Sequence, residues 1–142
     1  MAAVNLDDAR ALLLEDEGCV LHAYEDSRGF MTIGVGRCVD KRVGGGITHA
    51  EAMFLLDNDI DRAMTDIEKR YPWAEDLSDA RQLVLLSMRF NLGAAGLSKF
   101  TRMLEAVIKH DYDEAADQML ASDWAKQVKG RARRLAEMMR RG

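Results

Sequence analysis

Two carboxylates and a hydroxyl stand close together near the start of the chain. Glu17 precedes Gly18, Asp26 opens the run Asp26-Ser27-Arg28-Gly29, and Thr32 follows Asp26 by six residues. Two carboxylates in different environments suit glycoside hydrolysis, in which one protonates the leaving oxygen while the other activates water or attacks the sugar carbon. These three residues are therefore candidates for hydrolytic chemistry.

Each candidate has an expected role. Glu17 is expected at the C-terminus of a helix, where the negative end of the helix dipole disfavours the ionised carboxylate and so suits a general acid. Asp26 is expected in a solvated turn, which suits a base or an electrostatic stabiliser. Thr32 could place its hydroxyl on the same water, and Gly34 and Gly36 would let a sugar ring approach the backbone.

A purely structural explanation exists for each of the three. A glutamate at a helix end is often only solvated, an aspartate that opens a turn often bonds the backbone, and threonine favours strands. Only the order and spacing of the three together favour function.

A helix and a hairpin must position these groups. Asn5 can cap a helix over residues 6–17. Two β-prone runs follow, residues 20–25 and 30–35, and the segment between them has Asp first and Gly fourth, as in a type I turn. The three candidate groups are thus set around one hairpin that begins directly after a helix.

The rest of the chain is predicted to be helical. Thr48 and Glu51 have the spacing of a capping box and open a helix that reaches about residue 70, and Pro72 marks its end. Further helices are expected at 78–92 with a stop at Gly93, at 98–109, at 111–120, around Trp124 and at 131–140. This order predicts an α+β fold, in which a cleft between a small β lobe and a helical lobe would take an extended substrate.

Composition narrows the class of protein. A chain of 142 residues with 48% hydrophobic content suits one domain with a real core. Residues 1–5 lack the features of a secretory signal and no run of about 18 apolar residues occurs, so we expect synthesis in the cytosol. Cys19 and Cys38 are expected to be free thiols, with a disulfide between them as the minor alternative. The three histidines are scattered, and we expect no metal and no cofactor.

Charge is distributed unevenly along the chain. The net charge is −4, but residues 126–142 carry seven basic side chains and one acidic one, or +6, which leaves −10 on the first 125 residues. Such a segment could contact an anionic polymer or membrane, or it could be a solvated helical face.

Several motifs together resemble the phage-type lysozymes of glycoside hydrolase family 24. The matching positions, in family order and nearly family spacing, are Asp16-Glu17-Gly18, Tyr24, Asp26, Gly29, Thr32-Ile33-Gly34-Val35-Gly36, Ile47-Thr48, Glu51-Ala52, Phe90-Asn91-Leu92-Gly93, Phe100-Thr101, Asp113-Glu114-Ala115-Ala116, Trp124, Gln127 and Arg131-Ala132. They extend along nearly the whole chain.

The resemblance implies a fold and an activity. The fold would be a single lysozyme-like domain, 1–142, with a small β lobe at about 18–47, a connecting helix at about 48–70 and a helical lobe of about 71–142 plus 1–17. The activity would be inverting endo-hydrolysis of the β-1,4 bond between N-acetylmuramic acid and N-acetylglucosamine in peptidoglycan.

The resemblance also implies roles for individual residues. Glu17 would be the general acid, Asp26 the carboxylate that acts on the water, and Thr32 the hydroxyl that positions it. Phe90, Asn91 and Gln118 would contact substrate, and amide side chains suit acetamido sugars because they both donate and accept. Arg131 would pair with the catalytic glutamate.

Some positions depart from the family pattern. An Arg37–Asp59 ion pair is expected in place of a histidine pair of the family. Arg89 is interpreted as a surface charge, with recognition of a peptide-stem or muramyl carboxylate as the alternative. Met103 replaces a small polar residue and could weaken a sugar contact, whereas Trp124 is expected to be a core anchor rather than a sugar platform.

Two other classes of protein remain open. One is a helical module that binds nucleic acid or membrane through the basic segment, although no helix-turn-helix or aromatic stacking pattern occurs. The other is a relative that binds glycan without cutting it, which the presence of Glu17, Asp26 and Thr32 together argues against. The resemblance implies an enzyme that is made in the host cytoplasm, reaches the wall after release by a separate holin and needs no nucleic acid. We expect it to be a monomer.

Overall fold

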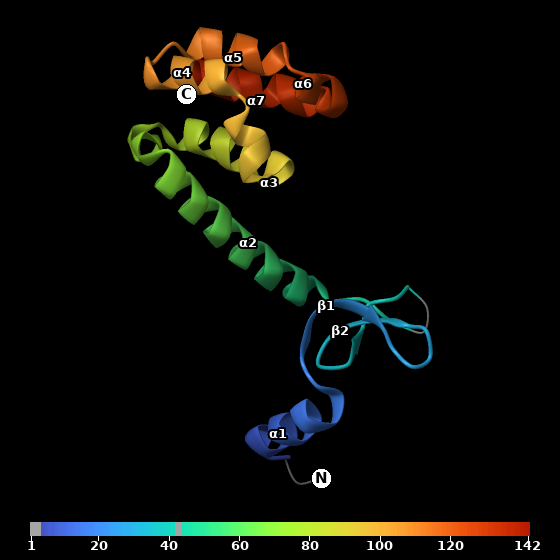
Figure 1. Ribbon diagram of the computed structural model, residues 1–142. Helices are drawn as coiled ribbons and strands as arrows, with labels where there is room; N and C mark the ends of the chain where they lie inside the picture. The colour runs from blue at the N-terminus through green and yellow to red at the C-terminus, as the bar shows by residue number, and fades with distance from the viewer. Residues whose placement is uncertain (1–3, 42–43) are drawn as a thin grey trace. The chain divides into compact units, whose positions relative to one another are not determined.

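The computed structural model describes residues 4–41 and 44–142, which form helices α1 to α7, a short 3-10 helix and a three-stranded sheet (Figure 1). The chain divides into two compact units, residues 1–54 and 55–142. Residues 1–3, on which part of the expectation about a secretory signal rests, lie outside the described residues. The mostly helical chain with its small antiparallel sheet has the α+β fold predicted from the sequence.

Helix α1, Leu6–Glu17, has the predicted bounds. The Asn5 side chain accepts a hydrogen bond from the Asp8 backbone N–H at 3.0 Å, which satisfies one of the free donors at the helix start. The helix ends at Gly18, whose φ of 70° suits glycine, and Glu17 is therefore its last residue.

The sheet of the first unit has one more strand than the predicted hairpin. Strands β1 (Val20–Glu25), β2 (Met31–Gly34) and β3 (Arg37–Cys38) pair antiparallel in that order. The predicted β-turn between the first two strands is present, because the Gly29 N–H donates to the Asp26 carbonyl at 3.0 Å. Cys38 is on β3 and Cys19 precedes β1, on the other side of β2, and both thiols are free.

Helix α2, His49–Arg70, begins with the predicted capping box. The Thr48 hydroxyl accepts from the Glu51 N–H at 3.1 Å, and the Glu51 carboxylate accepts from the Thr48 N–H at 2.8 Å. After Arg70 the chain turns through a short 3-10 helix that starts at Pro72.

The second unit continues as a helical bundle. Its remaining helices are α3 (Asp79–Ser98), α4 (Thr101–Ile108), α5 (Tyr112–Leu120), α6 (Asp123–Val128) and α7 (Gly130–Arg141). The predicted stop at Gly93 is visible as a break within α3, where φ is 76° and ψ is 170°. Helices α4 to α7 lie side by side (Figure 1), and alanines buried on α5 and α7 allow these two helices to approach closely.

The hydrophobic core of the described residues lies in this bundle. Methionines fill much of it, and the fully buried ones are Met88, Met103, Met119 and Met139. Trp124 is 4% exposed and packs edge-on against Phe100, which confirms its predicted role as a core anchor. Among the described residues, no helix is both long and apolar enough to cross a bilayer.

Candidate active site

The Glu17 carboxyl lies against the turn between β2 and β3. A methyl group placed on Gly36 would stand 2.8 Å from Glu17 Oε2 and 2.9 Å from Glu17 Cδ. Gly36 also has φ of +67°, which favours glycine. From the sequence, Gly36 was expected to let a sugar ring approach the backbone. In the structure, the carboxyl of Glu17, the candidate acid, lies against it.

The side chains of Asp26 and Thr32 both bond the backbone of Phe30. Asp26 Oδ1 accepts from the Phe30 N–H at 2.9 Å and from the Arg28 N–H at 2.9 Å. The Thr32 hydroxyl donates to the Phe30 carbonyl at 3.0 Å, and Thr32 is 4% exposed. Both side chains are thereby held to the backbone of one residue, and fixed positions suit groups that act on one water.

The backbone bonds of Asp26 also fit the structural explanation of that residue. An aspartate at the first position of a turn commonly accepts from the N–H two residues on, and Asp26 does so with Arg28. These two bonds use only Oδ1, and a carboxylate has a second oxygen with which it can act on water. The turn therefore orients the carboxylate and leaves it an acceptor for chemistry.

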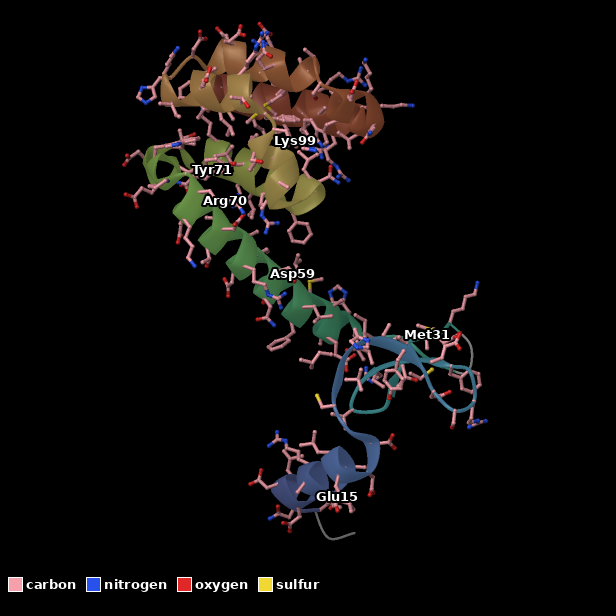
Figure 2. All side chains as sticks on the ribbon, in the orientation of Figure 1. Glu15, Met31, Asp59, Arg70, Tyr71 and Lys99 are labelled. Carbon is pink, nitrogen blue, oxygen red and sulfur yellow. The ribbon has the colours of Figure 1, made fainter. Side chains whose placement is uncertain are left out.

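Arg37 pairs with Glu51, so the predicted Arg37–Asp59 pair is wrong. The guanidinium donates to both carboxylate oxygens, with distances of 2.6 Å to Oε2 and 2.7 Å to Oε1. The hydrogen bond from Arg37 is the main cause that lowers the pKa of Glu51, and the bond from the Thr48 N–H is the second. Together they bring this pKa to about 2. Asp59 is about two turns further along α2 (Figure 2). The resemblance pointed to the wrong acid because this chain has a carboxylate on the first turn of the helix.

The predicted substrate-binding residues belong to the second unit and line two different hollows. Phe90, Asn91 and Arg131 line one of about 730 Å³, here called the Phe90 hollow. Gln118 lines another of about 700 Å³, here called the Gln118 hollow, together with Thr101 and other side chains. Glu17, Asp26 and Thr32 belong to the first unit. The predicted Arg131–Glu17 pair involves both units and stays a prediction.

Asn91 has a partner that the sequence did not indicate. Its Oδ1 accepts from the Trp124 indole N–H at 2.8 Å, across 33 residues of chain. Gln118 donates to Glu114 one turn earlier on α5 at 2.7 Å. Both amides therefore already have one bond, and each keeps further donors or acceptors for a ligand.

Two of the departures from the family pattern have structural explanations. Arg89 Nε donates to Asp66 Oδ2 at 2.8 Å, and the side chains are only 24% and 23% exposed. Arg89 is thus an interhelical partner, and the preferred interpretation as a surface charge is wrong. Met103 is fully buried in the core and lies at the wall of the Gln118 hollow.

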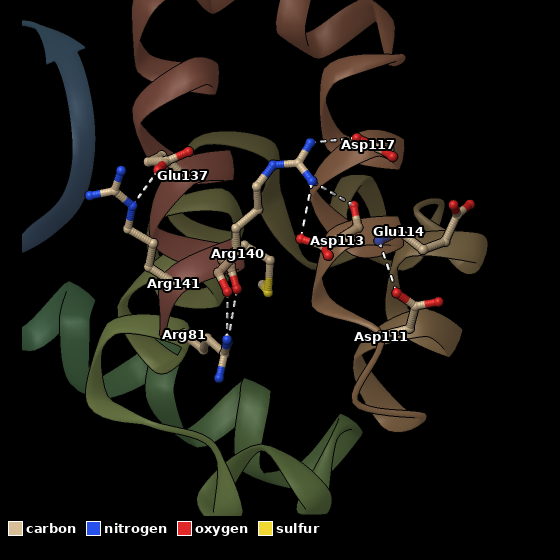
Figure 3. A network of polar contacts seen from close by, with 9 residues as sticks. Arg81, Asp111, Asp113, Glu114, Asp117, Glu137, Arg140 and Arg141 are labelled. Atoms are coloured by element: carbon tan, nitrogen blue, oxygen red, sulfur yellow. Dashed lines mark hydrogen bonds and ion pairs between the residues drawn. The ribbon is translucent and has the colours of Figure 1, made fainter.

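The basic segment 126–142 is part of the folded bundle. Helix α7 buries Leu135, Ala136 and Met139. Figure 3 shows Arg140 between Asp113 and Asp117, Arg141 beside Glu137, and Arg81 at the carbonyls of the last turn. Within the part of the chain that the structure describes, the basic residues of this segment without an ion-pair partner are Lys129, Arg131, Arg133 and Arg134.

No group of three or more His, Cys, Asp or Glu side chains among the described residues could hold a metal ion. Phe30 and Gly36 are the residues that sequence reasoning missed as supports. The turn pattern at Asp26 could have indicated the first, whereas the contact of Glu17 with Gly36 has no local signal.

Comparison with known proteins supports a hydrolase. A family model described as phage lysozyme matches residues 14–141. The chain is 31% identical over 156 residues to the pre-baseplate central spike protein Gp5 of Enterobacteria phage T4, a match that covers 92% of this chain and 27% of that protein. It is 27% identical to the probable T4-type lysozyme 2 of Dictyostelium discoideum, with 92% of each covered. A SAR-endolysin of Escherichia phage Mu is 31% identical over 78% of this chain and 63% of that protein.

Proposed function

Because the chain belongs to the phage lysozyme family, a family of glycoside hydrolases that act on peptidoglycan, we propose that it hydrolyses the β-1,4 bond between N-acetylmuramic acid and N-acetylglucosamine. Glu17 protonates the glycosidic oxygen as the bond breaks. Asp26 takes a proton from the attacking water, which Thr32 holds through its hydroxyl oxygen. Attack by this water on the face opposite the leaving group inverts the anomeric configuration.

The observation that carries this proposal is the shared support of Asp26 and Thr32. Their side chains bond the N–H and the carbonyl of Phe30, so the carboxylate and the hydroxyl are fixed on one short segment. The Glu17 carboxyl lies against Gly36, in the turn between β2 and β3. An acid and a base held by separate supports suit a reaction that needs both in one transition state.

Contacts to the sugars are proposed for the second unit. Phe90, Asn91 and Gln118 contact the acetamido sugars, and Arg131 pairs with Glu17. Asn91 and Gln118 line hollows that are large enough for a sugar or a peptide stem, which supports this assignment.

The place of action follows from the substrate. The protein acts as a monomer on the cell wall, after release from the host cytoplasm through a membrane lesion made by a separate holin, and its activity lyses the host cell. A relative named a SAR-endolysin supports action at the wall. Lys129, Arg133 and Arg134 would contact an anionic membrane, because these basic side chains have no ion-pair partner among the described residues.

The test compares wild type with Glu17→Gln and with Glu15→Gln, an exposed glutamate on the same helix. We expect Glu17→Gln to lower the rate of clearing of purified peptidoglycan by about 10²–10⁴-fold, the usual contribution of a general acid. Glu15→Gln should clear at the wild-type rate. The released ends should carry reducing muramic acid, in the inverted anomeric form when analysed at once.

Other results would point elsewhere. Anhydro ends would identify a lytic transglycosylase, and equal rates for Glu17→Gln and wild type would overturn the assignment of the acid. Absence of clearing by wild type would favour a glycan-binding protein without activity.

A further inference from the structure

We propose that Arg37 and Glu51 are positioning residues, which hold the turn between β2 and β3 so that Gly36 supports the Glu17 carboxyl. The inference deepens the proposed function, on which it rests, because it assumes that Glu17 is the acid. It concerns the first unit alone.

The turn that carries Gly36 is weakly held by the sheet. Strand β3 consists of only Arg37 and Cys38, which pair with Ile33 and Thr32 of β2. Two paired residues give a short ladder, which the bond from the Val39 N–H to the Met31 carbonyl at 2.8 Å extends, and so small a pairing is only marginally stable by itself. A contact as close as that between Gly36 and Glu17 therefore needs a second anchor for the turn.

Arg37, which directly follows Gly36, supplies that anchor. Both of its terminal nitrogens donate to Glu51, at 2.6 and 2.7 Å. A fork of this kind fixes the direction of the guanidinium as well as its distance, which a lysine at the same position could not do.

Glu51 is itself fixed to helix α2. Its carboxylate accepts from the Thr48 N–H at 2.8 Å while its own N–H donates to the Thr48 hydroxyl at 3.1 Å. The start of α2 is thereby connected through Arg37 to the turn that touches Glu17. The pKa of Glu51, lowered to about 2 by Arg37 and Thr48, keeps the carboxylate charged throughout the neutral range.

The pair is better suited to positioning than to global stability. The Arg37 and Glu51 side chains are 48% and 38% exposed, and ion pairs at such exposure contribute little to unfolding free energy. The same geometry can still matter for catalysis, because a small displacement of an acid is costly to the rate.

The experiment measures kcat and KM on purified peptidoglycan, and the melting temperature of each protein. The variants are Arg37→Met, Arg37→Lys, Glu51→Gln and the double variant Arg37→Met with Glu51→Gln. Glutamine at position 51 can still complete the capping box, so Glu51→Gln removes the charge pair and keeps the helix start. Arg62→Met and Glu68→Gln, at exposed positions of α2, are the matched controls.

We expect Arg37→Met and Glu51→Gln to lower kcat roughly 10-fold with KM and melting temperature unchanged. Arg37→Lys should recover part of kcat, and the double variant should be no slower than the slower single variant, because both remove one interaction. The two controls should match wild type.

Glu17→Gln, assayed alongside, separates two kinds of failure. If Glu17→Gln is inactive while Arg37→Met and Glu51→Gln retain wild-type kcat, the positioning role is overturned and the proposed function stands. A change confined to KM would also overturn it, since that indicates a substrate contact. If Glu17→Gln keeps full activity, the acid assignment fails and this inference fails with it.

Discussion

Phe30 brings no chemistry of its own to the hairpin, yet its backbone holds two of the three candidate catalytic groups. Its N–H donates to Asp26 and its carbonyl accepts from Thr32. Beyond the other end of strand β2, Gly36 limits where the Glu17 carboxyl can lie. The geometry of the site thus depends on backbone atoms, whose positions the side-chain identities alone do not specify.

Replacement of Gly36 by alanine is expected to lower kcat/KM about 100-fold. The new methyl group would overlap the Glu17 carboxyl and displace it. Gly34→Ala is the control for backbone strain, because Gly34 has φ of +68° with nothing within 4 Å of the added carbon. Both variants should lose about 1–2 kcal/mol of unfolding free energy in urea. Equal losses of activity in the two would contradict the contact with Glu17.

At the scale of elements, an aspartate of helix α2 forms ion pairs with two arginines, one on its own helix and one on α3. Asp66 accepts from Arg89 of α3 at 2.8 Å and from Arg70 of its own helix at 2.8 Å. Arg89 and then Arg70 lower the pKa of Asp66 below its ordinary value of 3.8. A carboxyl whose pKa is lower in the folded state stabilises the fold while it is ionised.

Asp66→Asn is expected to lose roughly 1 kcal/mol of unfolding free energy at pH 7, a value reduced for the partial exposure of the pair. The advantage of wild type should be complete above the unfolded pKa of about 3.8 and should shrink as the pH falls below it, through the lower folded value. Urea unfolding from pH 7 to pH 2 measures this difference. Asp61→Asn, at an exposed position of α2, is the control, and a difference that grew toward low pH would contradict the ion pair.

At the scale of the whole molecule, the two units differ in how much core they contain. The buried hydrophobic residues of the described chain all lie in the unit of residues 55–142, from Ala63 to Met139. In the described part of the other unit, Thr32 is the buried residue. The unit that contains the candidate catalytic groups therefore has little core of its own.

A fragment of residues 55–142 is expected to fold by itself, since it retains the described hydrophobic core. Circular dichroism should show a helical fragment with a cooperative urea transition. A fragment of residues 1–54 should show no cooperative transition, because burial of apolar surface is the main stabilising contribution to folding. A cooperative transition in the shorter fragment would contradict this division of stability.

The starts of helices and the hairpin turn were predictable because their signals are local. Asn5, Thr48, Ser78 and Asp111 each accept from a backbone N–H three residues on, at the helix start. The three candidate catalytic residues are proposed from their order and spacing, and their assignment stays a prediction.

What the sequence alone determined is thus the α+β class, the capped elements and the family. The tertiary structure decided the partners: Glu51 rather than Asp59 for Arg37, Asp66 for Arg89, and Trp124 for Asn91. Caps and turns depend on groups within about four residues of each other, so their pattern is visible in the chain. Ion pairs between elements depend on which side chains lie close together in space. The sequence offers several acids that could pair with each arginine, and only the tertiary structure shows which one lies within reach.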